Sequence, residues 1–176
     1  MGHYVLPIVK GQDYKVEYSK ENFLDDEQLF AAINLRANDT LELPIIKLIT
    51  TEIGRAVNLE NIFYDFGKAT LRPISKEVIA KLSRQLIKYP YLVIEIGSHT
   101  DNIGSDAANL KLSNARSQSV VNYMISQGID KDLIVARGYG ESIPKVPNEN
   151  PDGSDNPDNR QINRRTEFKV LDYKFD

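Results

Sequence analysis

The chain has 176 residues, with 22 Lys and Arg against 25 Asp and Glu, and a formal net charge of −3. This length holds one full domain and part of a second, and the charge gives no field that would attract nucleic acid or an acidic membrane surface. The absence of cysteine excludes disulfides, zinc–thiolate sites and thiol nucleophiles, and with only His3 and His99 as histidines we expect no metal site.

The start of the chain carries no targeting signal. No run approaches the roughly 18 apolar residues that cross a bilayer, and Met1-Gly2-His3-Tyr4 is not the opening of a signal peptide. This favours either a cytoplasmic protein or an excised piece. The strand-like sequence directly after His3 favours a piece that begins inside a larger protein.

Residues 1–57 are predicted to form a β-rich segment, with a boundary near residues 50–59. Four short stretches are rich in β-branched and aromatic residues and are separated by polar turns. They are Tyr4 to Val9, Tyr14 to Tyr18, Ala31 to Leu35 and Leu41 to Leu48. Because these strands are too few for a closed sandwich, we interpret the segment as the remnant of an upstream domain.

From Asn61 onward, strands alternate with helices. Asn61 to Phe66 is predicted as a strand, followed by a helix from Pro73 to Tyr89, because proline suits the first helical turn and another proline follows the last. Tyr91 to Gly97 is almost wholly apolar and is therefore predicted as a central strand. A loop from Ser98 to Gly104 precedes a second helix from Ser105 to Gln127, ended by a glycine.

The remaining elements complete one layered domain over residues 58–176. Leu133 to Tyr139 is predicted as a strand, Ser142 to Asn163 as a long polar loop, and Arg165 to Leu171 as a closing strand with Thr166, Phe168 and Val170 on one side. The order strand, helix, strand, helix, strand, strand predicts an α+β fold. In this βαβαββ sandwich both main helices pack on one face of a mixed sheet.

The second helix carries an arginine on its apolar face. Steps of three or four residues place Arg116 in line with Asn109, Ser113, Val120, Met124 and Gln127. A guanidinium there needs a partner. The nearest carboxylate by topology is Asp101, at the end of the preceding strand, where ligands bind in open α/β sheets.

Two interpretations of Asp101 and Arg116 stay open on spacing alone. The first is an internal salt bridge between them. The second is a split receptor for a zwitterion, in which Asp101 binds an ammonium group and Arg116 grips a carboxylate.

Five motifs occur in order over residues 58–172. They are Ile62-Phe63-Tyr64-Asp65-Phe66 with Leu71-Arg72-Pro73, Ser98-His99-Thr100-Asp101 with Gly104, Asn109-x-x-Leu112-Ser113-x-x-Arg116, Gly138-Tyr139-Gly140-Glu141 with Pro144, and Asn163-Arg164-Arg165-x-Glu167. In this order and spacing they resemble the OmpA-like C-terminal domain. The resemblance implies a non-catalytic periplasmic domain without a cofactor, which binds peptidoglycan and so tethers the outer membrane to the cell wall.

The resemblance also implies the residues of the site. Asp101 and Arg116 match the pair that holds the free end of meso-diaminopimelate in the stem peptide, an ammonium beside a carboxylate. Lysine-type stems lack that carboxylate and would be disfavoured. Further ligand contacts are expected from Thr100, Asn109 and Leu112, with a core position as an equal alternative for Leu112.

Four other residues are expected to support the pocket. Strand alternation places Tyr64 and Asp65 near its rim and turns Phe63 and Phe66 toward the core. Asn163 and Arg165 are expected to brace the pocket rather than touch the ligand.

The sequence lacks the residues that a catalytic triad, a metal site or an EF-hand would need. The chain has no cysteine and His99 has no second histidine nearby, so a triad or metal site lacks members and a structural or solvent-facing role is expected for His99. The chain is therefore predicted not to be an enzyme. The polar loop from Asn148 to Asn159 lacks the ligand spacing of an EF-hand. The alternative function is a structural or assembly domain that binds a protein partner.

The N-terminal segment has a resemblance of its own. Lys10-Gly11-x-x-Tyr14-x-Val16 and Leu41-x-Leu43-Pro44-Ile45 look like the closing strands of a carboxypeptidase-regulatory-like sandwich. This implies a native protein that continues upstream and reaches the outer membrane through that missing part.

Overall fold

The computed structural model describes residues 9, 11–31, 46–65 and 67–174. The chain divides into two compact units, Met1–Thr50 and Thr51–Asp176. In the first unit β1 (Asp13–Tyr18) pairs antiparallel with β2 (Asp26–Ala31). The strand expected from Tyr14 to Tyr18 is confirmed, whereas β2 was missed.

Two other strands expected in the first unit lie wholly or mostly outside the described residues. These are Tyr4 to Val9 and Ala31 to Leu35. Of Leu41 to Leu48, only residues 46–48 are described, and they form no strand.

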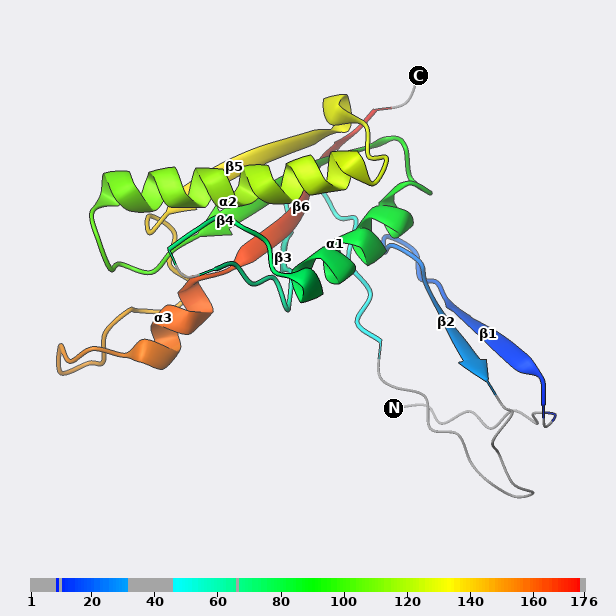
Figure 1. The fold of residues 1–176 in the computed structure, drawn as a ribbon, viewed down its shortest axis with the longest axis horizontal. Coiled ribbons are helices and arrows are strands. Elements are labelled where there is room, and N and C mark those ends of the chain that lie inside the picture. Colours follow the sequence, from blue (N-terminus) through cyan, green and yellow to red (C-terminus); the bar gives the residue numbers. More distant parts are fainter. Residues whose placement is uncertain (1–8, 10, 32–45, 66, 175–176) are drawn as a thin grey trace. The chain divides into compact units, whose positions relative to one another are not determined.

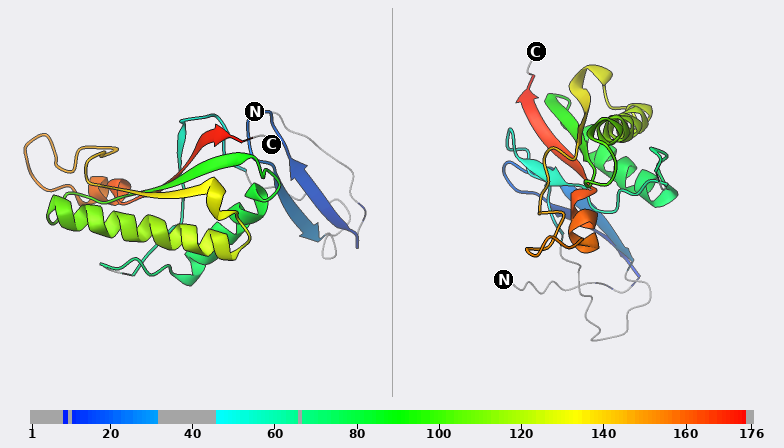
Figure 2. Two further views of the ribbon diagram at one scale, coloured as in Figure 1. Left: turned by 90° about the horizontal axis from the view of Figure 1, so that it is seen from above. Right: turned by 90° about the vertical axis from the view of Figure 1, so that its left-hand side faces the viewer.

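The second unit is built on a four-stranded mixed sheet with the strand order β3-β6-β4-β5. Strand β4 pairs parallel with β5 and antiparallel with β6, which also pairs antiparallel with β3. The elements are β3 (Ala56–Asn58), α1 (Pro73–Leu86), β4 (Leu92–His99), α2 (Asp106–Ser126), the 3-10 turn η1 (Lys131–Leu133), β5 (Ile134–Gly140), α3 (Pro157–Asn163) and β6 (Thr166–Tyr173). Helices α1 and α2 lie on the same face of the sheet (Figures 1 and 2), so the predicted α+β fold is confirmed.

The helix ends follow local sequence signals. Helix α1 begins at Pro73 and ends at Leu86, three residues before the expected end. Helix α2 is capped by Ser105, whose hydroxyl accepts a hydrogen bond from the backbone N–H of Ala108 at 3.3 Å. It is followed by Gly128 in the left-handed region, at φ 101°, which favours glycine.

The core lies between the sheet and the two long helices. Strand β4 is central, as its apolar sequence predicts, and Thr166, Phe168 and Val170 of β6 are buried on one side as expected. Fully or almost fully buried apolar side chains come from α1 (Ile79, Leu82, Leu86), α2 (Val120, Val121, Met124) and β4 (Leu92, Ile94, Ile96). This packing fixes α2 over the strands whose ends carry the candidate site.

Helix α2 also approaches the edge strand β5 very closely. A Cβ atom added at Gly138 would lie 2.2 Å from the backbone nitrogen of Asn114. The side chains of Asn114 and Ser113 accept hydrogen bonds from the backbone N–H groups of Gly138 and Gly140, at 2.9 and 2.8 Å. Glycine at position 138 therefore sets the distance between helix and sheet, and these bonds satisfy donors of an edge strand.

The strand expected from Asn61 to Phe66 is wrong for its described residues, 61–65. The chain turns at Asn61, which has φ 63°, and only an isolated bridge joins Tyr64 to Leu71. The buried hydroxyl of Ser75 accepts from Phe63 N–H at 2.7 Å and donates to Phe63 C=O at 2.9 Å. These local bonds replace those of a sheet, and the first strand of the unit is β3 instead.

The long loop expected from Ser142 to Asn163 contains a short helix that was missed. Asn156 caps α3 by accepting a hydrogen bond from the backbone N–H of Asn159 at 3.0 Å, and Pro157 occupies the first turn. The helix ends where β6 is about to begin, so its last residues lie next to the end of the central strands.

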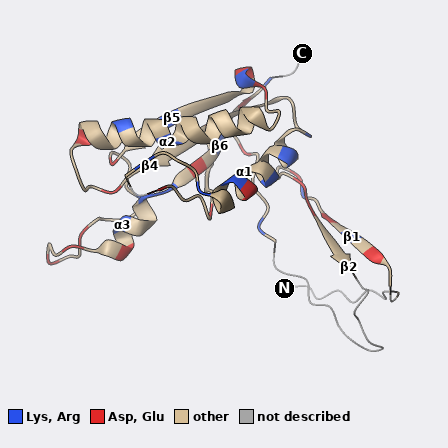
Figure 3. Cartoon of the chain, in the orientation of Figure 1, with Lys and Arg blue, Asp and Glu red and all other residues tan. Residues whose placement is uncertain are grey.

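Charge is mixed along the described chain. In the view of Figure 3, basic and acidic segments are interspersed along the ribbon. In the part of the chain that the structure describes, no helix is both long enough and apolar enough to cross a membrane. The same residues contain no cluster of three or more His, Asp and Glu side chains that could hold a metal ion.

Candidate functional site

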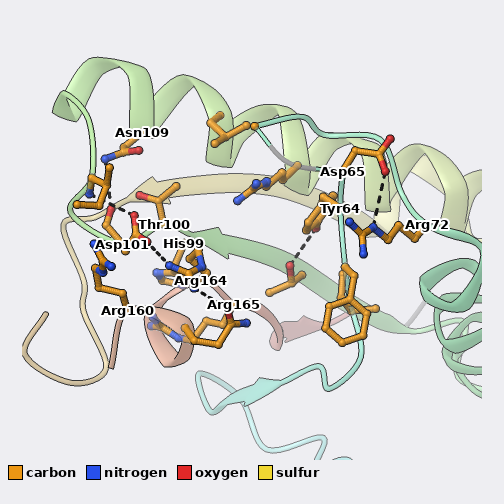
Figure 4. Close-up of a pocket in the computed structure, with 18 residues that line it drawn as sticks. Tyr64, Asp65, Arg72, His99, Thr100, Asp101, Asn109, Arg160, Arg164 and Arg165 are labelled. Carbon is orange, nitrogen blue, oxygen red and sulfur yellow. Dashed lines mark hydrogen bonds and ion pairs between the residues drawn. The ribbon is translucent and has the colours of Figure 1, made fainter. Parts of the chain in front are cut away.

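A cavity of about 620 Å³ lies within the second unit, at the ends of β4 and β6. Its walls come from residues 62–65 and 67, the loop after β4, the first half of α2, and α3 with the residues that follow it (Figure 4). Five arginines line it, at positions 72, 116, 160, 164 and 165, but only two carboxylates, Asp65 and Asp101. The cavity is therefore suited to a ligand that carries negative groups.

Asp101 lies at the start of the loop after β4 and is almost buried, with 8% of its surface exposed. Its Oδ1 accepts a hydrogen bond from the backbone N–H of Ile103 at 3.2 Å. Its Oδ2 forms an ion pair with the guanidinium of Arg164. A carboxylate so placed keeps acceptor capacity, because each oxygen offers two lone pairs.

Arg116 is half-buried on α2 and takes part in a different set of contacts. Its Nε donates to the backbone carbonyl of Lys68 at 3.2 Å, and its guanidinium lies 4.9 Å from the centre of the Tyr64 ring. Burial lowers its pKa from the usual value, an effect that the charge of Asp101 partly offsets. No carboxylate among the described residues lies within 4 Å of it. The salt bridge between Asp101 and Arg116 that the sequence left open is not formed.

The other expected ligand contacts also line the cavity. Thr100 is 4% exposed, and its hydroxyl has no hydrogen-bond partner among the described residues. The amide nitrogen of Asn109 donates to the backbone carbonyl of Asp101 at 3.2 Å and to the carboxylate of Glu141, so it holds the loop in place. Leu112 lies on the cavity wall and is half-buried.

Tyr64 and Asp65 line the cavity as expected. The Tyr64 hydroxyl lies 3.0 Å from Oγ1 of Thr166, and burial raises the pKa of this phenol. Asp65 forms an ion pair with Arg72 at 3.7 Å. The expectation that Phe63 points to the core is wrong: it is 42% exposed and lines the cavity, because the segment is not a strand. Phe66 lies outside the described residues.

Asn163 and Arg165 make contacts that fit the bracing role. The amide of Asn163 is fully buried and forms hydrogen bonds with Lys145, Val146 and Asn148. Arg165 bonds to Glu167 at 2.7 Å and to the carbonyl of Ile143 at 3.1 Å. These bonds tie the long loop to the start of β6.

His99 is not solvent-facing but 3% exposed. Its ring stacks on Tyr139 with centres 4.9 Å apart, and its Nε2 lies 3.3 Å from Oε2 of Glu167. The neighbouring imidazole, together with Arg165, lowers the pKa of Glu167 to about 2. The contacts of His99 are those of a packed structural residue.

The sequence profile of the OmpA family matches residues 63–160, more than half of the chain and most of the cavity wall. The chain belongs to the OmpA family. Family membership confirms the predicted resemblance and places the chain among envelope-associated proteins that are structural and not enzymes.

The relatives of this OmpA-family chain include proteins with different names. Outer membrane protein A of Escherichia fergusonii is 45% identical over 91 residues, which cover 50% of this chain and 37% of that protein. Photosystem I P700 chlorophyll a apoprotein A2 of Gloeobacter violaceus is 40% identical over 111 residues, 63% of this chain but 13% of that protein. The chain thus spans well under half the length of both relatives.

A solved structure has the same fold. The putative MotB like protein from Desulfovibrio vulgaris is 29% identical, with a TM-score of 0.54 over 65% of this chain and 70% of that one. This chain therefore shares the fold of that protein over about two thirds of its length.

Arg160 and Arg164 line the cavity but were not expected in the site. Arg160 lies in the short helix α3, which was hidden in what was predicted to be a loop, and Arg164 directly follows that helix. Arg160 is paired with Asp155 at 3.0 Å. Arg164 stands in the Asn-Arg-Arg motif beside Arg165, and that motif was the signal that could have found it.

Proposed function

We propose that this OmpA-family domain binds peptidoglycan without a covalent bond, by holding the free end of meso-diaminopimelate in the cavity. In the parent protein this binding tethers the outer membrane to the cell wall. The name of the Escherichia fergusonii relative, outer membrane protein A, supports the outer membrane as the location. The domain itself would stand on the periplasmic face of that membrane.

The observation that carries the proposal is a cation in the cavity wall that no carboxylate of the described residues pairs. Arg116 is half-buried, positively charged and without a carboxylate partner among the described residues, although burial disfavours its charge. A buried charge without a partner costs free energy that a bound counter-ion recovers. A ligand carboxylate would supply it, gripped by the two terminal nitrogens that no described hydrogen bond uses.

The ammonium of the same ligand end would bind Asp101. Both residues line one cavity, and the charge of Asp101 acts on the guanidinium of Arg116. Thr100 adds to the same wall a hydroxyl that has no hydrogen-bond partner in the described part of the chain. A ligand that offers ammonium and carboxylate on one carbon therefore matches the two charges, whereas a lysine side chain matches only Asp101.

The alternative of an assembly domain with an internal Asp101–Arg116 bridge has lost its supporting observation, because Asp101 pairs with Arg164 instead. No second function is favoured by a feature of the described residues.

Binding to purified diaminopimelate-type sacculi tests the proposal. Asp101→Asn removes one charge at constant size, and Arg116→Gln removes one charge while keeping a shorter polar side chain. Each should weaken binding by about tenfold or more, since buried charge contacts contribute several kcal/mol to affinity. Arg84→Gln on the exposed side of α1 is the matched control and should bind like the unmodified chain. Undiminished binding by both site variants, with circular dichroism spectra of folded protein, would remove Asp101 and Arg116 from the site.

A further inference from the structure

The ion pair between Asp101 and Arg164 places an internal cation on the group that is proposed to receive the ligand ammonium. Arg164 follows the last residue of α3, and its guanidinium also bonds to the side-chain oxygen of Gln161 one turn earlier. It contacts Oδ2 of Asp101, whereas Oδ1 is held by the loop backbone. Oδ2 is thus the oxygen that an incoming ammonium can reach without unfolding the loop.

The two partners differ in exposure in a way that permits exchange. The Asp101 side chain is 11% exposed, whereas that of Arg164 is 36% exposed. The buried carboxylate needs a cationic partner at all times, but the more exposed arginine on the rim can turn into water once a ligand ammonium takes its place at Asp101. Figure 4 shows Arg164 reaching Asp101 from the side of α3, opposite Asn109.

The balance of charges at the site also favours replacement of Arg164 by a ligand ammonium. Without ligand, the positive charges of Arg116 and Arg164 face the single negative charge of Asp101, and Arg164 acts on Arg116 as a like charge. A zwitterion that replaces Arg164 at Asp101 would pair all charges at the site once Arg164 turns to solvent. A dicarboxylate without an ammonium group would have no means of displacing it.

We propose that Arg164 occupies the ammonium position of the free domain and is exchanged for the ligand ammonium on binding. It thereby acts as a specificity-determining residue: only ligands that carry an ammonium group gain from its release, and their affinity is lowered by the free energy needed to displace it. This inference rests on the proposed function, since it assigns Asp101 to the ammonium.

The test compares Arg164→Gln with the unmodified chain by calorimetric titration with meso-diaminopimelate and with pimelate, which has the same two carboxylates but no ammonium groups. Removing the arginine that competes with the ligand for the buried Asp101 carboxylate should tighten diaminopimelate binding by about two- to fivefold. Pimelate binding should not tighten, because no ammonium is exchanged. Arg160→Gln removes the same charge one turn earlier in the chain but leaves Asp101 paired, and it should tighten the binding of neither ligand.

The outcomes separate the two proposals. If the unmodified chain binds diaminopimelate but Arg164→Gln binds it no more tightly, the exchange is wrong and the proposed function stands. If neither chain binds it, the proposed function fails and the exchange fails with it. As a second measurement independent of the variant's folding, the Arg164 Nε–H resonance of the unmodified chain should shift with diaminopimelate and not with pimelate. An unchanged resonance at saturating diaminopimelate would overturn the exchange.

Discussion

Gly138→Ala tests whether the contact between α2 and β5 positions the site. The new methyl group would lie 2.2 Å from the backbone nitrogen of Asn114, 2.7 Å from its Cα and 2.6 Å from Oγ of Ser113. Ordinary contacts need about 3.5 Å. Because two of these atoms belong to the helix backbone, no rotation of a side chain can relieve them, and α2 must move away from the strand.

The expected cost follows from these contacts. Overpacking of this kind costs about 1–3 kcal/mol. Movement of α2 also strains the two hydrogen bonds from Gly138 and Gly140 to Asn114 and Ser113, each contributing about 0.5–1.5 kcal/mol. Their sum, roughly 2–6 kcal/mol, is a large part of the 5–15 kcal/mol that stabilises a typical domain.

Urea denaturation followed by circular dichroism measures this loss. Gly97→Ala is the matched control: the same change on the neighbouring strand puts the methyl group 3.1 Å from a ring carbon of Tyr139, a side chain that can shift. It should cost about 1 kcal/mol or less. Because Asn114 lies two residues before Arg116, folded Gly138→Ala should also bind sacculi more weakly. Equal stability of the two alanine variants would refute the close-contact reasoning.

Two further changes test the frame around the cavity. The pKa of Glu167 is lowered from 4.5 to about 2, mainly by His99. The stabilisation that this shift reflects is present above pH 4.5 and is lost as the pH falls toward 2. In acid titrations of stability, the unmodified chain should therefore lose about 1–2 kcal/mol more over that range than Glu167→Gln, once solvent screening is allowed for. Parallel curves for the two proteins would contradict this. Asn163→Ala removes the buried side-chain amide that accepts hydrogen bonds from the backbone N–H groups of Lys145 and Val146. It should destabilise the domain by about 2–4 kcal/mol and speed hydrogen exchange at those two backbone N–H groups, whereas Asn122→Ala at an exposed position should do neither. Slow exchange at both N–H groups in Asn163→Ala would show that other contacts hold the loop.

The sequence predicted the parts of the fold that depend on local patterns. Helix α2, with Ser105 as its cap and Gly128 after its end, and the central position of β4 follow from capping and from apolar runs. The segment at residues 61–65 has the composition of a strand, but its backbone groups are bound by Ser75, twelve residues or more away. No periodicity within the segment reveals such a partner.

The sequence predicted only part of the candidate site, because one of its contacts also depends on a segment distant in the chain. Asp101 and Arg116 could be brought to one pocket by topology, since both follow β4 and line the same cavity. Arg164 could not be assigned to Asp101, because this pairing depends on α3 forming within a loop rich in Pro and Asn. The sequence Asn156-Pro157-Asp158 does carry a cap and a first-turn proline, a signal that the surrounding turn residues concealed.

The most direct test of the central claim is an NMR titration of the folded chain with meso-diaminopimelate, following backbone amide and arginine side-chain resonances. The account predicts shifts confined to residues 100–104, the first half of α2 including Arg116, and Arg164. Absence of any shift at millimolar ligand, or shifts confined to residues outside the cavity, would contradict it.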